Sequence, residues 1–231
     1  MNMMMMMDTI QHHPDDELLL AHANSRLEVG TGLVLASHLE LCAHCRERMC
    51  TLEALGGVLL DELEPAALAD DALARTLARI DNNAAQGGSG TPKPRLIKVT
   101  APPPLPEGAR WPRSLTHCSA TPWRWMGPGM RWSRVTVPDA PDANVFLLRI
   151  ASGKYLPQHT HSGIELTQVL YGRFHDGRAL FGPGDFDAAD DSIHHQPVVQ
   201  DGSECICLAS VHGKLRFDGA IAKVFGALVG M

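Results

Sequence analysis

Two kinds of hydrophobic pattern divide the chain. Within residues 15–82, apolar positions recur at helical spacing, as in "DDALARTLARIDNN", where Leu73, Leu77 and Ile80 form one stripe. From residue 131 onward, short runs such as "NVFLLRIAS" and "CICLASVHGKLRF" are separated by Gly, Pro and Asp. Such runs are typical of strands in an all-β sandwich or barrel. We therefore predict α and β structure in separate domains, a small helical bundle followed by an all-β barrel.

A change of composition marks the boundary between the two patterns. The stretches "AAQGGSGTPKP" and "APPPLPEG" are rich in Gly, Ser and Pro and have no hydrophobic period. Such composition is typical of a linker that is flexible at first and stiffer later. We predict a helical domain at residues 8–84, a linker at residues 85–105 and a β domain at residues 106–225.

Charge is distributed unevenly between these parts. The net charge is −6, but residues 1–90 hold 14 acidic and 5 basic side chains, whereas residues 91–231 hold 12 and 15. An acidic first part argues against direct binding of nucleic acid through its phosphates. It suits a basic protein surface as the partner. The same acidity is also what a small helical domain needs to stay in solution, so charge alone does not identify a partner.

The cysteines point to intracellular chemistry. No stretch is long enough to span a membrane, and the start of the chain lacks the basic residues and cleavage site of a signal peptide. Tight CxxC and CxC pairs are then more often metal ligands or redox thiols than structural disulfides. We expect a cytoplasmic protein. Its six cysteines are Cys42, Cys45, Cys50, Cys118, Cys205 and Cys207.

The stretch "SHLELCAHCRER" carries the first candidate site. If one helix runs through it, His38, Cys42 and Cys45 project from the same face. Three such ligands lack only a fourth to close a tetrahedral zinc site. A redox dithiol is the first alternative, although the βαβ context typical of such pairs is absent. Two thiols packed as small hydrophobes are the second alternative. The candidates for the fourth ligand are His12, His13, His22, His44 and Cys50.

The stretch "GKYLPQHTHSGIELTQVLYG" carries the second candidate site. In a strand, residues two apart share a face, so His159, His161 and Glu165 can all point into a barrel. Two imidazoles and a carboxylate suit a divalent metal. The spacing resembles the first cupin motif, G(x)5HxH(x)3E(x)6G, which implies that residues 106–225 form a cupin domain. The alternative is a barrel that holds these side chains without a metal.

A later histidine is needed to complete this second site. Counted from Gly184, His195 occupies the ligand position of the second cupin motif, whereas His194 is out of register. Asp190 and Ser192 replace the Pro and Gly of that motif, which affects the turn and leaves the ligand in place. We expect zinc as the bound ion, although manganese, iron, nickel and copper also suit three His and one Glu.

The pair Cys205 and Cys207 lies on one face of a predicted strand. Two interpretations remain open for it. The thiols can approach the barrel interior and react with oxidants. They can also be buried cysteines of a β core.

The whole arrangement resembles the ChrR-type anti-sigma factors, on the stretches "HLELCAHCRER", "HTHSGIELTQVL" and "CICLA". The resemblance implies a structural zinc on His13, His38, Cys42 and Cys45, and a cupin metal on His159, His161, Glu165 and His195. It implies a protein that is not an enzyme and that binds a sigma factor of the extracytoplasmic-function type. The implied signal for release is singlet oxygen or organic peroxide, sensed through the cupin domain. Cys205 and Cys207 match a cysteine pair of the family.

Two other functions remain open on the residues alone. Cupins with this ligand set include dioxygenases, in which case the helical domain would be a regulatory part of a metal-dependent enzyme. A zinc-stabilised oligomerisation domain joined to a module that binds a small molecule would have no sigma partner.

Overall fold

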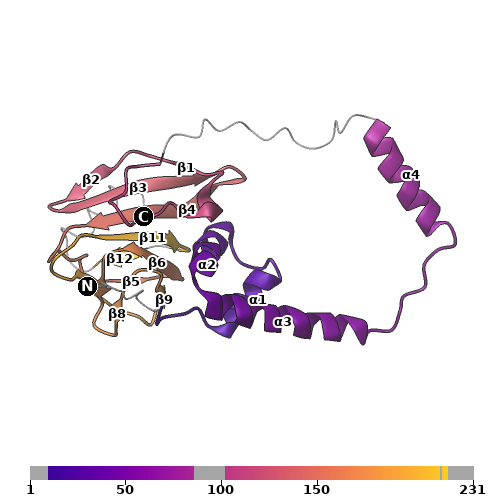
Figure 1. Cartoon of the computed structure of the whole chain (residues 1–231), viewed down its shortest axis with the longest axis horizontal. Helices are drawn as coiled ribbons and strands as arrows, with labels where there is room; N and C mark the ends of the chain where they lie inside the picture. The colour runs from indigo at the N-terminus through magenta and orange to yellow at the C-terminus, as the bar shows by residue number, and fades with distance from the viewer. Residues whose placement is uncertain (1–9, 86–101, 214, 218–231) are drawn as a thin grey trace, which may run out of the picture.

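The computed structural model describes residues 10–85, 102–213 and 215–217. The predicted order of helices followed by strands is confirmed (Figure 1). Among the described residues, no helix combines the length and the apolar character that crossing a membrane requires. The helices are α1 (Asp16–Ala23), α2 (Val29–Leu41), α3 (Ala43–Asp61), α4 (Ala72–Ala85) and the short 3-10 helix η1 (Arg113–Leu115).

The β part consists of antiparallel strands in three sheets. The large sheet has the order β1-β3-β4-β11-β6-β9, with β2 paired to β3, and the small sheets have the orders β10-β7-β8 and β12-β5. Phe174, Phe181 and Val199 of the three-stranded sheet pack in one core with Trp132 and Leu148 of the large sheet. The strands are β1 (Ser119–Ala120), β2 (Arg124–Gly127), β3 (Met130–Val137), β4 (Ala140–Ile150), β5 (His159–His161), β6 (Glu165–Tyr171), β7 (Phe174–His175), β8 (Leu180–Phe181), β9 (Phe186–Ala189), β10 (Val198–Val199), β11 (Cys205–Val211) and β12 (Leu215–Phe217).

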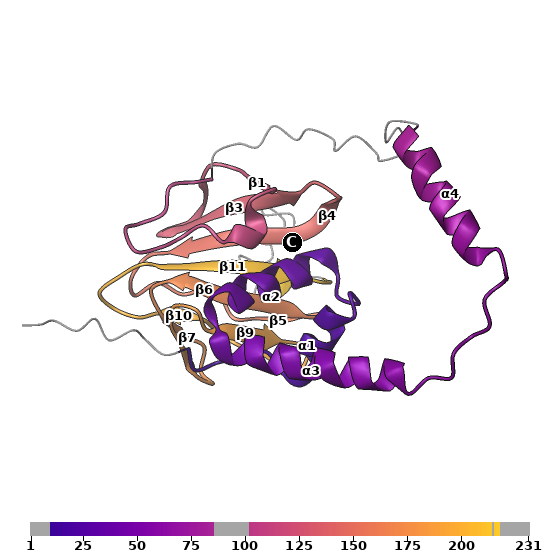
Figure 2. The same cartoon turned by 45° about the vertical axis from the view of Figure 1, so that its right-hand side comes forward.

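Helix α2 lies against the large sheet, so the helical and β parts share a hydrophobic core (Figure 2). Val34 and Leu35 of α2 are completely buried and belong to one cluster with Leu208 of β11. A glycine permits the closest approach, because a Cβ at Gly30 would lie 2.6 Å from the Ser210 Oγ. The two predicted domains are therefore distinct along the sequence and joined in space.

The predicted linker lies mostly outside the described residues, since residues 86–101 are not described. Its last residues lie against the β part, where the Trp123 Nε1 donates a hydrogen bond to the Pro104 carbonyl at 3.0 Å. The domain boundaries at 84, 105 and 225 remain predictions.

One expectation about the helices is wrong. His38, Cys42 and Cys45 do not project from one continuous helix, because α2 ends at Leu41 and α3 begins at Ala43. Cys42 has an extended backbone, with φ −91° and ψ 104°, and its Sγ accepts a hydrogen bond from the Cys45 N–H at 3.4 Å. A thiol thus caps the first turn of α3, where helix N–H groups have no partner within the helix.

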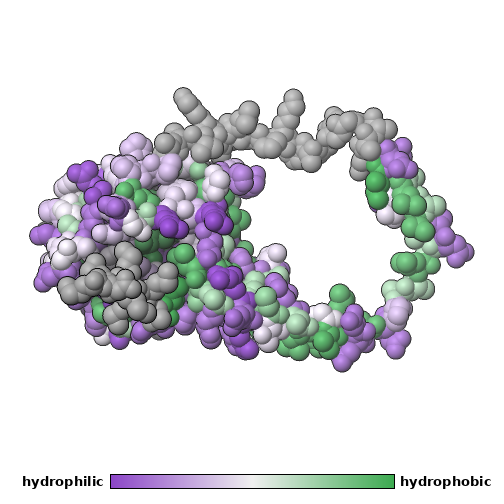
Figure 3. All heavy atoms as spheres, viewed as in Figure 1, coloured by the Kyte–Doolittle hydropathy of each residue, from purple (hydrophilic) through white to green (hydrophobic). Residues whose placement is uncertain are grey.

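The end of α3 and the whole of α4 project away from the rest of the molecule (Figures 1 and 2). The bundle therefore comprises α1, α2 and the first turns of α3, while the described residues of α4 from Leu73 to Asn82 are all exposed. Apolar side chains gather along this arm (Figure 3). Its exposed large apolar residues are Leu55, Val58, Leu59, Leu60, Leu63, Leu68, Leu73, Leu77 and Ile80.

Candidate metal centres

The first candidate site gathers four side chains at the junction of α2 and α3. The His38 Nε2 lies 3.3 Å from the Cys45 Sγ, and the His13 Nδ1 lies 3.4 Å from the Sγ atoms of both Cys42 and Cys45. All four ligand atoms lie within 4.8 Å of one another. Tetrahedral zinc with ordinary Zn–N and Zn–S bonds separates such atoms by about 3.5 Å. The donor set and its spacing therefore fit zinc.

The surroundings of these side chains favour metal ligation over redox chemistry. Burial lowers the pKa of His38 to about 4, so its imidazole is neutral, as a ligand must be. Burial, together with the neighbouring Cys42, raises the pKa of Cys45 to about 12. A reactive thiol needs a lowered pKa, so this pair is a poor redox couple on its own. A bound dication would supply the charge that stabilises the thiolates.

Of the five candidates for the fourth ligand, the structure brings His13 to the thiols. It is placed by the turn before α1, where the Asp15 carboxylate caps the helix by accepting from the Leu18 N–H at 2.8 Å. Cys50 is exposed on α3, and the His12 Nε2 bonds the Leu180 carbonyl instead. The His44 ring lies beside the His13 ring, with their centroids 4.8 Å apart.

The second candidate site lies within the β part and consists of four buried side chains from β5, β6 and the segment before β10. His159, His161, Glu165 and His195 offer ligand atoms within 4.8 Å of one another. The His161 Nε2 lies 2.5 Å from the Glu165 Oε2, and the Nε2 atoms of His159 and His195 lie 3.2 Å apart. His194, the competing residue, is exposed.

Hydrogen bonds on the far side of two of the rings fix their orientation. The Nδ1 of His159 bonds the Pro157 carbonyl at 2.8 Å, and the Nδ1 of His161 lies 3.4 Å from the Asp190 carbonyl. These carbonyls only accept, so each Nδ1 carries a proton and leaves a lone pair on Nε2. Nε2 lone pairs that face a common point repel one another unless a cation lies between them. Histidine ligands of a bound metal have this arrangement.

Two carboxylates of this second site, Glu165 and Asp176, have lowered pKa values, whereas burial raises the pKa of Asp187. Burial is the largest influence on Glu165 and would raise its pKa, but the imidazoles of His159 and His161 lower it below its ordinary value. Burial likewise opposes a lowered pKa at Asp176, which is held down by His195 and nearby N–H groups. Carboxylate oxygens and imidazole nitrogens together fit a divalent cation.

Cys205 and Cys207 lie beside the second site. Both line a cavity of about 40 Å³ together with His159, Glu165 and His195, and their Sγ atoms are 3.7 Å apart. The hydrogen bond with Cys205 and then burial raise the pKa of Cys207 well above its ordinary value. The thiols are therefore buried cysteines of the β core that also face the interior beside the candidate metal ligands. As at the first site, the raised pKa makes Cys207 a poor nucleophile on its own, so its oxidation would depend on the charge of a bound dication.

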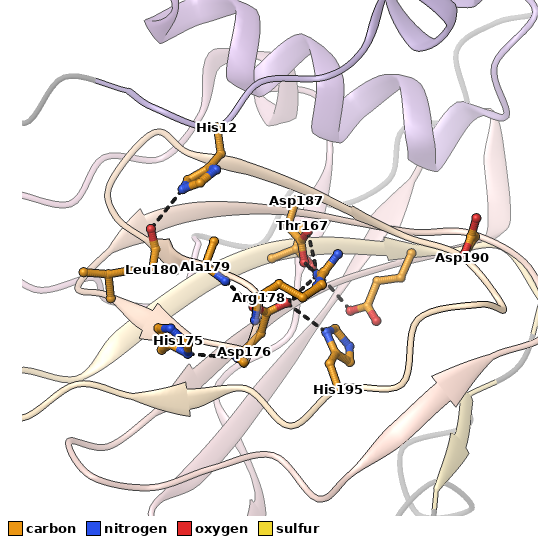
Figure 4. A network of polar contacts seen from close by, with 12 residues as sticks. His12, Thr167, His175, Asp176, Arg178, Ala179, Leu180, Asp187, Asp190 and His195 are labelled. Carbon is orange, nitrogen blue, oxygen red and sulfur yellow. Dashed lines mark hydrogen bonds and ion pairs between the residues drawn. The ribbon is translucent and has the colours of Figure 1, made fainter.

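A further network of hydrogen bonds and ion pairs surrounds His195, and none of its other residues was predicted from the sequence. Asp176 accepts from the His195 Nδ1 at 3.4 Å, and Arg178 bridges Asp176 to Asp187 in β9, with a distance of 2.8 Å to the second carboxylate (Figure 4). Asp176, Asp187 and His195 cluster like a third cation site. The Arg178 guanidinium already balances both carboxylates, so the cluster supports His195. Acidic residues in Gly-rich turns carry no sequence signal that separates this role from ordinary turn chemistry.

Comparisons with known proteins cover both parts of the chain. Residues 112–215 match the family model described as "ChrR Cupin-like domain". The anti-sigma-E factor ChrR of Cereibacter sphaeroides is 39% identical over 217 residues, which are 94% of this chain and 96% of that protein. A crystal structure of Rhodobacter sphaeroides SigE in complex with the anti-sigma ChrR matches at 36% identity with a TM-score of 0.63. The match covers 88% of this chain and 100% of the other.

Proposed function

This chain belongs to the family of ChrR anti-sigma factors, and on that premise we propose that it sequesters a sigma factor of the extracytoplasmic-function type. Bound in this way, the sigma factor is kept off core RNA polymerase in the cytoplasm. The chain then acts by binding and not as an enzyme. The solved complex of SigE with the anti-sigma ChrR supports the choice of partner, because the match covers 88% of this chain and 100% of the matched chain.

The observation that carries this proposal is the exposed apolar arm formed by the end of α3 and by α4. Leu73 of α4 is 71% exposed and Leu68, in the connection between α3 and α4, is 82% exposed, and seven further large apolar residues of the arm are exposed as well. Exposed apolar surfaces of this kind mark protein interaction sites. Residues 1–90 are acidic, so the arm combines apolar contacts with charge that suits a basic partner.

The zinc that we propose for His13, His38, Cys42 and Cys45 is structural. Four protein ligands leave no open position for a substrate. The ion would fix the angle between α2 and α3 at Cys42, and with it the direction in which the arm projects. The N-terminal metal would therefore position the arm for binding without itself contacting the partner.

The β part is the proposed sensor of oxidative stress, with zinc on His159, His161, Glu165 and His195. Singlet oxygen or an organic peroxide would act at the cavity that these residues share with Cys205 and Cys207. A hydroperoxide, ROOH, can transfer one oxygen atom to a thiol, which yields a sulfenic acid and the alcohol ROH. A cavity of about 40 Å³ has room for water-sized groups, so only the reactive end of a larger peroxide would enter it.

Gel filtration of the full chain with its sigma factor tests this proposal. The candidate partner is the extracytoplasmic-function sigma factor encoded nearest to the gene. We expect a co-migrating complex that dissociates when a strong chelator removes the N-terminal metal. If the folded, metal-loaded chain forms no complex, a metal-dependent cupin enzyme of the dioxygenase type becomes the better proposal. A sigma-independent binding module is then the other candidate.

Replacing both Cys205 and Cys207 with Ser should abolish release by organic peroxide while the sigma factor remains bound. The two side chains lie inside the β part, away from the apolar arm, so the substitutions remove oxidisable sulfur without touching the proposed interface. The measurement is dissociation of the purified complex after peroxide treatment. Cys118→Ser is the matched control, because Cys118 is also buried but does not line the cavity. Unchanged release in the double variant would exclude these thiols as the sensor.

A further inference from the structure

The two candidate metal sites are connected by one short segment of the β part, Gly182–Asp187, which joins β8 to β9 and enters β9. The Gly184 carbonyl accepts a hydrogen bond from the His38 Nδ1 at 2.9 Å, although the two residues are 146 positions apart. A carbonyl can only accept, so this bond places the proton on Nδ1 and leaves the Nε2 lone pair for a metal. The β part therefore orients a ligand of the helical site.

Asp185 holds the segment before α1 that carries His13. Its Oδ1 accepts from the Gln11 N–H at 2.6 Å and from the His12 N–H at 3.0 Å, and its Oδ2 accepts from the Gly182 N–H at 2.7 Å. Asp185 is buried, with 5% of its surface exposed. A buried carboxylate with three backbone donors is a rigid attachment.

Further contacts complete the attachment of residues 10–13. The Phe186 N–H donates to the His12 carbonyl at 3.1 Å, and the Phe186 ring lies edge-on to the His38 ring, with centroids 5.4 Å apart. Gly184 has a φ of +90°, and a Cβ there would lie 2.8 Å from Ile10 side-chain atoms. Only glycine permits both this backbone conformation and this close approach.

The same segment leads to the second candidate site. Asp187 follows Phe186 in β9 and pairs with Arg178, which pairs with Asp176, which accepts from the His195 Nδ1. Figure 4 shows His12 bonded to the Leu180 carbonyl, with Arg178 between Asp187 and Asp176, and His195 beyond Asp176. A displacement of β9 would therefore shift the hydrogen-bond partners of His195 and His38, and with them the segment that carries His13 in the helical site.

We propose that Asp185 and the Gly184 carbonyl are positioning groups of the N-terminal metal site, supplied by the β part, and that through them the cupin site controls metal retention by the helices. This inference rests on the proposed function for its purpose, since loosening the zinc at the α2–α3 junction would release the sigma factor. Its physical content is independent of any partner. A change that disorders the second site should weaken the contacts that orient His13 and His38. The residues of the second site are His159, His161, Glu165 and His195.

The test follows the N-terminal metal directly in the full chain. Cobalt(II) bound by thiolates has a charge-transfer absorption, and a Cys205→Ser, Cys207→Ser background removes the thiols beside the second site. The rate at which a chelator removes this absorption is measured without a sigma factor. Asp185→Ala should lose cobalt about 10-fold faster or more, the size expected when the outer partners of metal ligands are removed. Asp185→Asn should be intermediate, because one carbonyl oxygen can still accept from Gln11 and His12.

The exposed Asp201→Ala is the control for a generally weakened β part and should lose cobalt at the parent rate. A second equivalent of metal retained in Asp185→Ala would show that the β part is folded. The coupling is tested by His161→Gln, which removes one candidate ligand of the second site and should speed loss of the thiolate signal several-fold. Parent rates in Asp185→Ala would overturn the positioning role, and parent rates in His161→Gln would overturn the coupling. Neither result depends on whether a sigma factor binds.

Discussion

Cys42→Ser is expected to abolish metal binding by the helical site and sigma binding together. The Cys42 Sγ is a candidate ligand and also caps α3, so its loss removes one of four metal bonds and one of the contacts that shape the junction. Structural zinc contributes apparent binding free energies of about 10–16 kcal/mol in small zinc domains. Replacing the thiolate with a serine hydroxyl would remove a large part of this binding free energy. We expect zinc content near zero at this site and sigma affinity reduced by at least about 100-fold.

The measurement pairs metal analysis of the purified chain with a titration of the sigma factor. Cys50→Ser is the matched control, because Cys50 lies on α3, the helix that Cys42 caps, but is exposed and outside the four-residue group. It should keep both zinc and affinity. A Cys42→Ser protein that loses zinc and still binds the sigma factor at full affinity would contradict the structural role of the metal.

The first candidate site shows what sequence spacing can predict. The spacing of His38, Cys42 and Cys45 was sufficient to propose a shared metal, because three and four residue steps bring side chains together at a helix end as well as along a helix. It could not reveal the break at Cys42, since spacing does not encode the extended backbone of that single residue, whose thiol caps α3. The backbone conformation of one residue thus decided the geometry of the site.

At the second site, alternation in a strand explains only the pair His159 and His161, which lie together in β5. Glu165 begins the separate strand β6 and His195 lies before β10, so their positions were predicted from the resemblance to the cupin motifs. The hydrogen-bond partners that orient these side chains were not predicted. The Nδ1 partners of His159 and His161 are backbone carbonyls, which any residue type can provide. Asp176 supports His195 from a turn that only the folded chain brings near. Contacts of this kind depend on tertiary structure and leave no periodic signal.

The packing of the helical part against the β part was also not predicted from the sequence. Helix α2, "VGTGLVLASHLEL", is apolar on most positions, which predicts a buried helix but not its partner. The structure places it on β4, β6 and β11 of the sheet, so the surface that appeared to belong to a helical bundle is part of a shared core. Helix α4 shows the opposite case, since its apolar stripe has no such cover in the described residues.

Replacing Leu73, Leu77 and Ile80 of α4 with Ser is therefore expected to weaken sigma binding strongly without unfolding the chain. The three side chains are 71%, 52% and 58% exposed, so their loss removes little packing within the free protein. In a complex they would form one apolar stripe on a partner surface, because positions i, i+4 and i+7 share a helix face. Central apolar residues of an interface each contribute about 1–2 kcal/mol or more. Three together should lower the affinity by at least about 100-fold.

The control substitutes three residues on another face of the same helix, Ala74, Ala78 and Asn82, also with Ser. Both triple variants reduce helix propensity, but only the first removes the apolar stripe. Zinc content and thermal unfolding should match the parent chain in both, because neither set contacts the metal site or the shared core. Equal affinity of the two variants for the sigma factor would show that the partner binds elsewhere. A selective loss in the first variant would place α4 in the interface and identify its exposed stripe as the surface that sequestration buries.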